Sequence, residues 1–129
     1  MSLPRELNAG FVRNLPDNGP VVMVNLVRFR PNSADGDGSG WDAYLRYSKM
    51  SMPLIKGVGG TVLWAGDAEG FSYGSYPGGC WNYVVLVRYP SRAAFLEMIE
   101  SEPYAKANIH RDNGVDDHLI VATKQTYSK

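Results

Sequence analysis

The chain has 129 residues, which is enough for one domain with a single hydrophobic core but not for two. Its 13 basic and 13 acidic residues balance and form no Lys/Arg-rich stretch, so the composition argues against a nucleic-acid partner. The single cysteine, Cys80, excludes an internal disulfide and a multi-cysteine metal site, and no apolar stretch has the length of a membrane span or a signal peptide. We therefore expect a cytoplasmic protein with no membrane partner.

The first part of the chain predicts an extension followed by a strand. Residues 1–20 contain several Gly and Pro residues and one mildly amphipathic stretch, so we expect an N-terminal extension with a short helix or turn. Residues 21–30 are apolar on both parities near their middle, which is typical of a strand that is covered on both faces. The predicted domain runs over residues 21–127.

A helix and a second strand follow. Apolar residues recur at helical spacing over 41–56, and Ser39 with Asp42 forms a capping pair before them. Pro53 is expected to kink this helix or to end it early, because proline removes a backbone donor. A Gly-rich stop then precedes the second predicted strand, residues 61–67.

The last part of the chain predicts a second strand-helix-strand unit. The predicted elements in order are a long hairpin loop over 66–80, a strand over 81–89, a helix capped by Ser91, a shorter helical piece over 104–110 and a strand over 119–121. The break between the two helical pieces is the sequence Ser101-Glu102-Pro103.

The order β-α-β-β-α-β is the ferredoxin-like pattern of the α+β class, with a four-stranded antiparallel sheet and both helices on one face. All four strands read as apolar on both parities, so the second face of the sheet must also be buried. A second copy of the chain is the simplest cover, and we expect a homodimer.

Several segments together carry a resemblance to a known family. They are MVNLVRF (Met23 to Phe29), the Tyr44 to Tyr47 helix leading to Gly59-Gly60, VVLVRYPS (Val84 to Ser91) with FLEMIESEPY (Phe95 to Tyr104), and His110-Arg111 followed by the strand after Asp117. In these segments the chain resembles the DUF1330 family. The resemblance covers roughly residues 20 to 125. That family belongs to the dimeric α+β barrel superfamily, so the resemblance implies a homodimer with two sheets face to face. It implies no established reaction, and we expect no cofactor.

The polar loop between the first strand and the first long helix imitates part of a calcium site. Its spacing Asp35-x-Asp37-x-Ser39-Gly40 matches the first six positions of an EF-hand loop. The twelfth position, which should supply a bidentate carboxylate, is Arg46. We therefore expect no calcium site.

Asn25 is the most unusual residue of the first strand, because an amide in a buried segment needs hydrogen-bond partners. Two interpretations remain open: a structural hydrogen bond to a loop or to the dimer mate, and a polar group in a ligand pocket. Cofactor-independent quinol-forming monooxygenases and haem-degrading relatives in the superfamily similarly place a polar side chain on the first strand, in some cases with a Trp and a His nearby. By analogy, Trp64 or Trp81 and His110 take those parts here.

The pair His110-Arg111 ends a helical segment, where a cation interacts favourably with terminal carbonyls, so structural and functional roles are both open for His110. Arg111 is expected to pair with Asp116 or Asp117. His118 begins the last predicted strand and is expected to be exposed. A metal site built from these histidines and aspartates matches no known spacing, and none is expected.

Arg28 and Arg88 lie near the ends of two strands that should be neighbours. Their guanidinium groups can form an anion or carboxylate site, or lie at the rim of the sheet beside surface glutamates. The further candidates for contact with a ligand are Tyr47, Trp64, Trp81 and Arg111.

Two functional hypotheses follow. The first is a homodimer with a small, largely apolar pocket for an aromatic or lactone-like metabolite, possessing cofactor-free monooxygenase or isomerase activity. His110 is then the general base, and Asn25 with Arg28 or Arg88 steadies an enolate or phenolate oxygen. The alternative is a non-catalytic small-ligand-binding or stress-related module. A buried histidine that opens into a cavity beside Asn25 favours the first, and a closed core in which both residues are satisfied favours the second.

Overall fold

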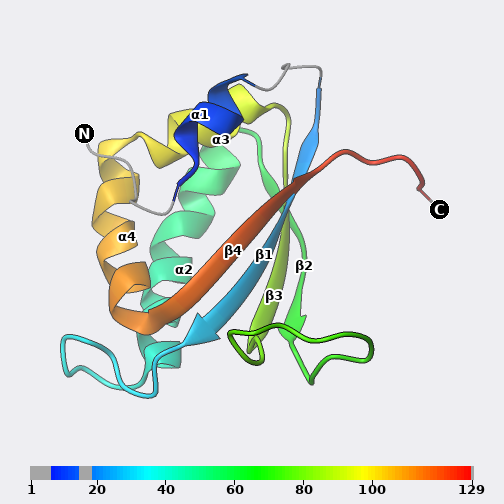
Figure 1. The fold of residues 1–129 in the computed structure, drawn as a ribbon. Coiled ribbons are helices and arrows are strands. Elements are labelled where there is room, and N and C mark those ends of the chain that lie inside the picture. Colours follow the sequence, from blue (N-terminus) through cyan, green and yellow to red (C-terminus); the bar gives the residue numbers. More distant parts are fainter. Residues whose placement is uncertain (1–6, 15–18, 129) are drawn as a thin grey trace.

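A four-stranded antiparallel sheet with helices on one face makes up the fold (Figure 1). The computed structural model describes residues 7–14 and 19–128. The strands are β1 (Val21–Phe29), β2 (Thr61–Asp67), β3 (Tyr83–Tyr89) and β4 (Val115–Thr123), and the helices are α1 (Ala9–Asn14), α2 (Gly40–Gly57), α3 (Arg92–Ile99) and α4 (Glu102–Gly114). The strand order β2-β3-β1-β4 is that of the ferredoxin-like fold, which confirms the predicted α+β class.

One face of the sheet, the core face, packs against the helices. Met23 and Val27 of β1 point to this face and are 2% and 0% exposed. Met23 belongs to a core cluster that includes Phe95 of α3, and Val27 packs with Tyr44 of α2. Because side chains alternate along a strand, Asn25 lies between these two residues on the same core face.

The opposite face of the sheet, the outer face, has no helix over it in the part of the chain that Figure 1 draws in colour. In the register of the sheet, Trp64 lies opposite Leu86, and Leu119 and Val121 lie opposite Leu26 and Val24. Trp64, Leu119 and Val121 are 54%, 39% and 49% exposed. A broad apolar surface therefore faces away from the helices, as the strand pattern predicted.

Hydroxyl caps start the long helices where the sequence indicated. The Ser39 hydroxyl accepts from the Asp42 backbone N–H, and the Asp42 carboxylate accepts from the Ser39 N–H, which makes a complete capping box. Pro53 does not end α2, which continues to Gly57. Proline removes the hydrogen bond to the carbonyl of Lys49, but both residues are exposed, so water can satisfy that carbonyl.

The largest departure from the predicted elements is at the C-terminal end. Helix α4 continues to Gly114, and β4 begins directly at Val115, so no loop separates the two elements. The backbone N–H of Arg30 donates to the Gly114 carbonyl over 2.9 Å, which ties the junction to the end of β1. His118 therefore lies inside β4 and is half-buried, and the expectation that it is exposed was wrong.

The close approach of α2 and α4 at this junction requires glycine. A Cβ atom on Gly114 would lie 2.5 Å from the Gly40 carbonyl oxygen and 2.9 Å from the Ala43 Cβ. We expect Gly114→Ala to lower the free energy of unfolding by about 2 kcal/mol or more in urea titrations, because two helix backbones would have to separate.

Gly57→Ala is the matched control, since Gly57 ends α2 and a Cβ there meets no atom within 4 Å. This variant should keep or slightly raise the free energy of unfolding. Equal losses in the two variants would show that the contact between α2 and α4 is not tight.

Candidate functional site

A cavity of about 300 Å³ lies between the core face of the sheet and helices α2, α3 and α4. Most of its lining is aliphatic or aromatic, and the described residues that line it include no Asp, Glu, Lys or Arg. Its polar groups include Asn25, Tyr47, Ser51, Tyr104 and His118. A concave, largely apolar site with a few polar groups is the usual form of a small-molecule site.

A second cavity of about 180 Å³ lies beyond the β4 side of the first and is lined by residues of α1, α4 and β4. His118, Tyr104 and Ile120 line both cavities and so form part of the wall between them. Arg111 lines only the second cavity.

Asn25 is bonded on both sides across the sheet. Its Oδ1 atom lies 2.9 Å from Nε2 of His118 on β4, and its Nδ2 atom donates to the carbonyls of Met23 and Val85, each over 3.3 Å. The amide thus spans the sheet from β4 through β1 to β3. Asn25 therefore fits both interpretations left open by the sequence. Its amide makes structural hydrogen bonds, and it also borders a cavity.

Arg111 determines the state of this hydrogen-bond chain. It is 5% exposed, and its Nη1 atom lies 3.0 Å from Nδ1 of His118. A guanidinium group has only donors, so Nδ1 of His118 accepts and the ring proton is on Nε2, from which it is donated to Asn25. Arg111 also donates from Nε to Oδ1 of Asn108 over 2.6 Å, and its Nη2 lies 3.3 Å from the Asp112 carboxylate.

Two phenols stand at the same cavity. The hydroxyl oxygens of Tyr47 and Tyr104 lie 3.0 Å apart. Burial raises the pKa of both phenols, while the nearby Arg111 guanidinium acts on both in the opposite direction and more weakly. Both groups are therefore neutral near pH 7. One hydroxyl donates to the other, so the pair has one hydroxyl proton left to donate.

The structure does not bring His110 to Asn25. His110 lies on α4, its Nδ1 atom is buried without a hydrogen-bond partner in the described part of the chain, and the residue lines neither cavity. The histidine that meets Asn25 is His118, which the sequence analysis placed at the exposed start of a strand. The start of β4 was not predicted because Asp116 and Asp117 precede His118, and aspartate is depleted in strands. The alternation His118-x-Ile120-x-Ala122 was a usable signal for the strand.

The two arginines proposed as an anion site lie apart. The sheet is antiparallel, so Arg88 lies opposite Val22, at the other end of β1 from Arg28. Arg28 pairs with Asp116 over 3.1 Å and with Asp117 over 3.7 Å, and it donates to the Gly78 carbonyl. The predicted pairing of Arg111 with these two carboxylates was wrong, because Arg28 occupies them.

The two tryptophans named as ligand-contact candidates, Trp64 and Trp81, do not line the larger cavity, whereas Trp41 does. Trp64 is on the outer face, and Trp81 is 6% exposed with its ring centroid 5.2 Å from that of Tyr76. Of the ligand-contact candidates, Tyr47 lines the larger cavity and Arg111 lines the smaller one.

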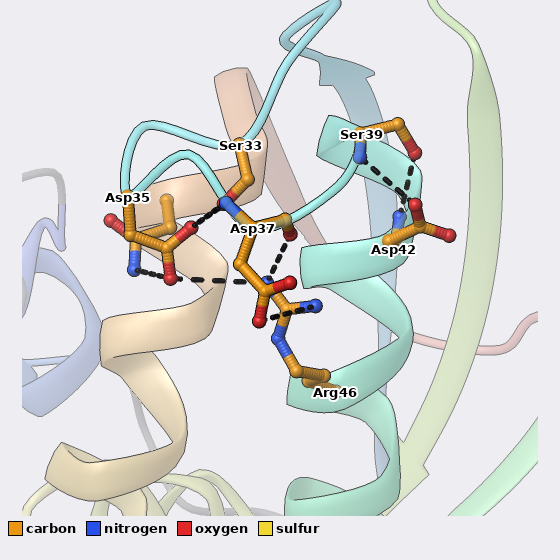
Figure 2. Close-up of polar contacts among 7 residues, drawn as sticks. Ser33, Asp35, Asp37, Ser39, Asp42 and Arg46 are labelled. Atoms are coloured by element: carbon orange, nitrogen blue, oxygen red, sulfur yellow. Dashed lines mark hydrogen bonds and ion pairs between the residues drawn. The ribbon is translucent and has the colours of Figure 1, made fainter.

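The acidic loop before α2 uses its carboxylates internally (Figure 2). Asp35 accepts from the Ser33 hydroxyl and from the Asp37 backbone N–H, and these bonds hold its pKa below the usual value. The Arg46 guanidinium lies 3.9 Å from the carboxylates of both Asp35 and Asp37. No group of three or more His, Cys, Asp or Glu residues is placed to hold a metal ion within residues 7–14 and 19–128.

Comparison with known proteins identifies the family to which the chain is similar. Residues 39–124 match the sequence model of the family described as "Domain of unknown function (DUF1330)". RPA0582, a protein of unknown function from Rhodopseudomonas palustris, has a crystal structure with 36% sequence identity and a TM-score of 0.84, covering 98% of this chain and 97% of its own. No protein with curated annotation matches the chain.

More distant crystal structures share the fold. A dimeric protein of unknown function with a ferredoxin-like fold from Bacteroides fragilis is 10% identical with a TM-score of 0.55, covering 85% of this chain and 100% of its own. A putative antibiotic biosynthesis monooxygenase from Caulobacter crescentus is 15% identical with a TM-score of 0.56, covering 89% of this chain and 97% of its own. Among the described helices, none has the length and apolar character needed to cross a membrane.

The raised pKa values at the cavity give an alkaline stability prediction. Above about pH 10 the unfolded chain loses phenol protons that the folded chain keeps, so the free energy of unfolding should fall as the pH rises. Tyr104→Phe should make this fall shallower, and should cost about 1 kcal/mol at neutral pH through loss of the bond to Tyr47. Urea titrations between about pH 8 and about pH 11 measure both effects.

Tyr73→Phe is the control, because Tyr73 is 98% exposed. It should leave both the neutral stability and the alkaline slope unchanged. Parallel curves for Tyr104→Phe and the unmodified protein would contradict the burial of this phenol.

Proposed function

This chain belongs to the DUF1330 family, and from that premise we propose that it is a homodimer that binds a small aromatic or lactone-like molecule in the cavity between its sheet and its helices. The observation that carries the proposal is the hydrogen bond of 2.9 Å between Asn25 and His118 in the wall of an otherwise largely apolar cavity. Polar groups at fixed positions orient a ligand, and the apolar lining supplies the affinity.

The size and lining of the cavity favour a flat, mainly apolar ligand. Its volume of about 300 Å³ is at the lower end of the range for small-molecule sites, which suits a molecule of one or two rings. Tyr44, Tyr83 and Phe95 contribute aromatic surface to the lining. Aromatic side chains offer large contact areas to a planar ligand.

The outer face supports the proposal of a homodimer. Trp64, Leu119 and Val121 expose an apolar surface that a solvent-facing sheet of a monomer would not normally present. The Bacteroides fragilis neighbour, which shares the fold, is described as dimeric. A second copy related by a two-fold axis would cover the face with an identical surface.

Val121→Asp tests the dimer by placing a carboxylate on the outer face. Val121 is 49% exposed there, and we expect this variant to shift the molar mass measured by light scattering from dimer to monomer. Ile109→Asp is the matched control, because Ile109 is 59% exposed on α4, and it should remain dimeric. A monomeric unmodified protein would refute the proposal, as would a Val121→Asp protein that remains a dimer.

Cofactor-free monooxygenase or isomerase activity is a second candidate function. An amide and an imidazole meet at the apolar cavity, and groups of this kind stabilise enolate or phenolate oxygens. The description of the Caulobacter crescentus neighbour as a putative antibiotic biosynthesis monooxygenase agrees with this reaction class. A non-catalytic binding module is the alternative, favoured by the fact that Asn25 and His118 satisfy each other.

A thermal-shift screen against hydroquinones, hydroxynaphthoates and lactones tests ligand binding without assuming a reaction. A ligand at about 100 times its Kd stabilises the folded state by about 2.7 kcal/mol. We expect the stabilisation to be lost in folded Asn25→Ala and His118→Ala proteins and to persist in His110→Ala, since His110 does not line the cavity.

Either of two results would contradict the cavity as the binding site: the absence of any hit across the panel, or a hit that survives in both the Asn25 and His118 variants. A hit lost only in His110→Ala would restore the role that the sequence suggested for His110. Oxygen uptake or isomerisation of the stabilising ligand then separates an enzyme from a binding module.

A further inference from the structure

The hydrogen-bond chain at the cavity has a single possible direction. Arg111 donates to Nδ1 of His118 over 3.0 Å, and Nε2 of His118 donates to Oδ1 of Asn25 over 2.9 Å. Each residue donates a hydrogen bond to the next residue toward the cavity. The order cannot be reversed, because arginine has no acceptor atom. In this arrangement both ring nitrogens of His118 are engaged, so His118 has no lone pair to offer as a base.

The hydrogen-bond chain ends in a donor at the cavity, the Asn25 amide. With Oδ1 of Asn25 held by His118, the amide presents its Nδ2 protons, which go to the carbonyls of Met23 and Val85 over 3.3 Å. These bonds are longer than the usual N–H···O distance and can be exchanged for a stronger acceptor. The neutral hydroxyls of Tyr47 and Tyr104 line the same cavity. One donates to the other, which leaves one hydroxyl proton for a ligand.

The first donor of this hydrogen-bond chain is a buried positive charge, the Arg111 guanidinium. Arg111 is 5% exposed, and among its partners is the Asp112 carboxylate, whose side chain is 60% exposed to solvent. On the strand, the Asp117 carboxylate accepts from the His118 backbone N–H over 2.9 Å, while its other oxygen lies near Arg28. No carboxylate is among the described residues that line the larger cavity.

We propose that Asn25, held by His118 and Arg111 and assisted by one hydroxyl of the Tyr47–Tyr104 pair, binds the ionised oxygen of a phenol or enol in the larger cavity. This inference rests on the proposed binding function and narrows its ligand class. Asn25 contacts the ligand oxygen, whereas His118 and Arg111 are positioning residues that act through the amide. A charge-assisted donor chain favours an anionic acceptor over a neutral one.

Binding of the ionised form needs no base from the protein. The ligand releases its hydroxyl proton to solvent water and buffer, the O–H bond is the only bond that breaks, and no electrons change hands. The chain then stabilises the oxyanion by hydrogen bonds and by the charge of Arg111.

The probes are 4-nitrophenol, whose ionised form is coloured, and 4-nitroanisole, which has no proton to lose. In absorbance titrations, the pKa of bound 4-nitrophenol should lie about one unit below its value in water, which means about tenfold tighter binding of the phenolate than of the phenol. 4-Nitroanisole should bind more weakly than 4-nitrophenolate. Calorimetry in two buffers should detect proton release when 4-nitrophenol binds below its solution pKa.

His118→Phe and Arg111→Met interrupt the chain at different points, so one variant remains informative if the other does not fold. Each should lose the pKa shift of bound 4-nitrophenol, and with it the preference for 4-nitrophenolate over 4-nitroanisole within the same variant. Arg46→Met is the matched control, because Arg46 pairs with loop carboxylates and lines neither cavity. It should retain the shift.

The results separate this inference from the binding function on which it rests. If the two probes bind equally well with no pKa shift, or if the shift survives in His118→Phe and Arg111→Met, the cavity binds aromatic molecules but the chain is not an oxyanion site. If neither probe binds, both the proposed aromatic ligand class and this inference are refuted.

Discussion

The interaction on which the site depends is the contact between the Arg111 guanidinium and Nδ1 of His118. Because a guanidinium group only donates, it sets the tautomer of His118 and, through it, the orientation of the Asn25 amide. The contact exists because α4 passes into β4 without a loop, so that Arg111 and His118 face each other across the junction at Gly114. The packing of Gly114 against Gly40 holds this junction in place.

The sheet divides the molecule into two environments with different tasks. On the core face, the Asn25 amide and the His118 imidazole lie among apolar side chains, and the helices cover this face. On the outer face, Trp64, Leu119 and Val121 form an exposed apolar surface. This division supports a ligand in the first environment and a second protein copy in the other.

The sequence predicted the fold well because its signals are local. The structure confirms the strands that are apolar on both parities, the serine caps of the helices and the β-α-β-β-α-β order. Asn25 lies at a cavity, which is one of the two interpretations that its unusual amide left open. The choice of histidine depended on where β4 begins. Asp116 and Asp117 are poor strand residues, and the pairing with Arg28, distant in sequence, helps to stabilise them there. A contact of that kind cannot be read from local periodicity, and neither can the separation of Arg28 from Arg88 by an antiparallel register.

The most direct test of the central claim is the tautomer of His118, measured by long-range ¹H–¹⁵N correlation spectra of the protein labelled at histidine. His118→Phe identifies the signals, which separates them from those of His110. We expect a neutral ring near pH 7 with the proton on Nε2 and an unprotonated Nδ1 that accepts from Arg111. A ring protonated on Nδ1, alone or together with Nε2, would contradict the direction of the hydrogen-bond chain and with it the role assigned to Asn25.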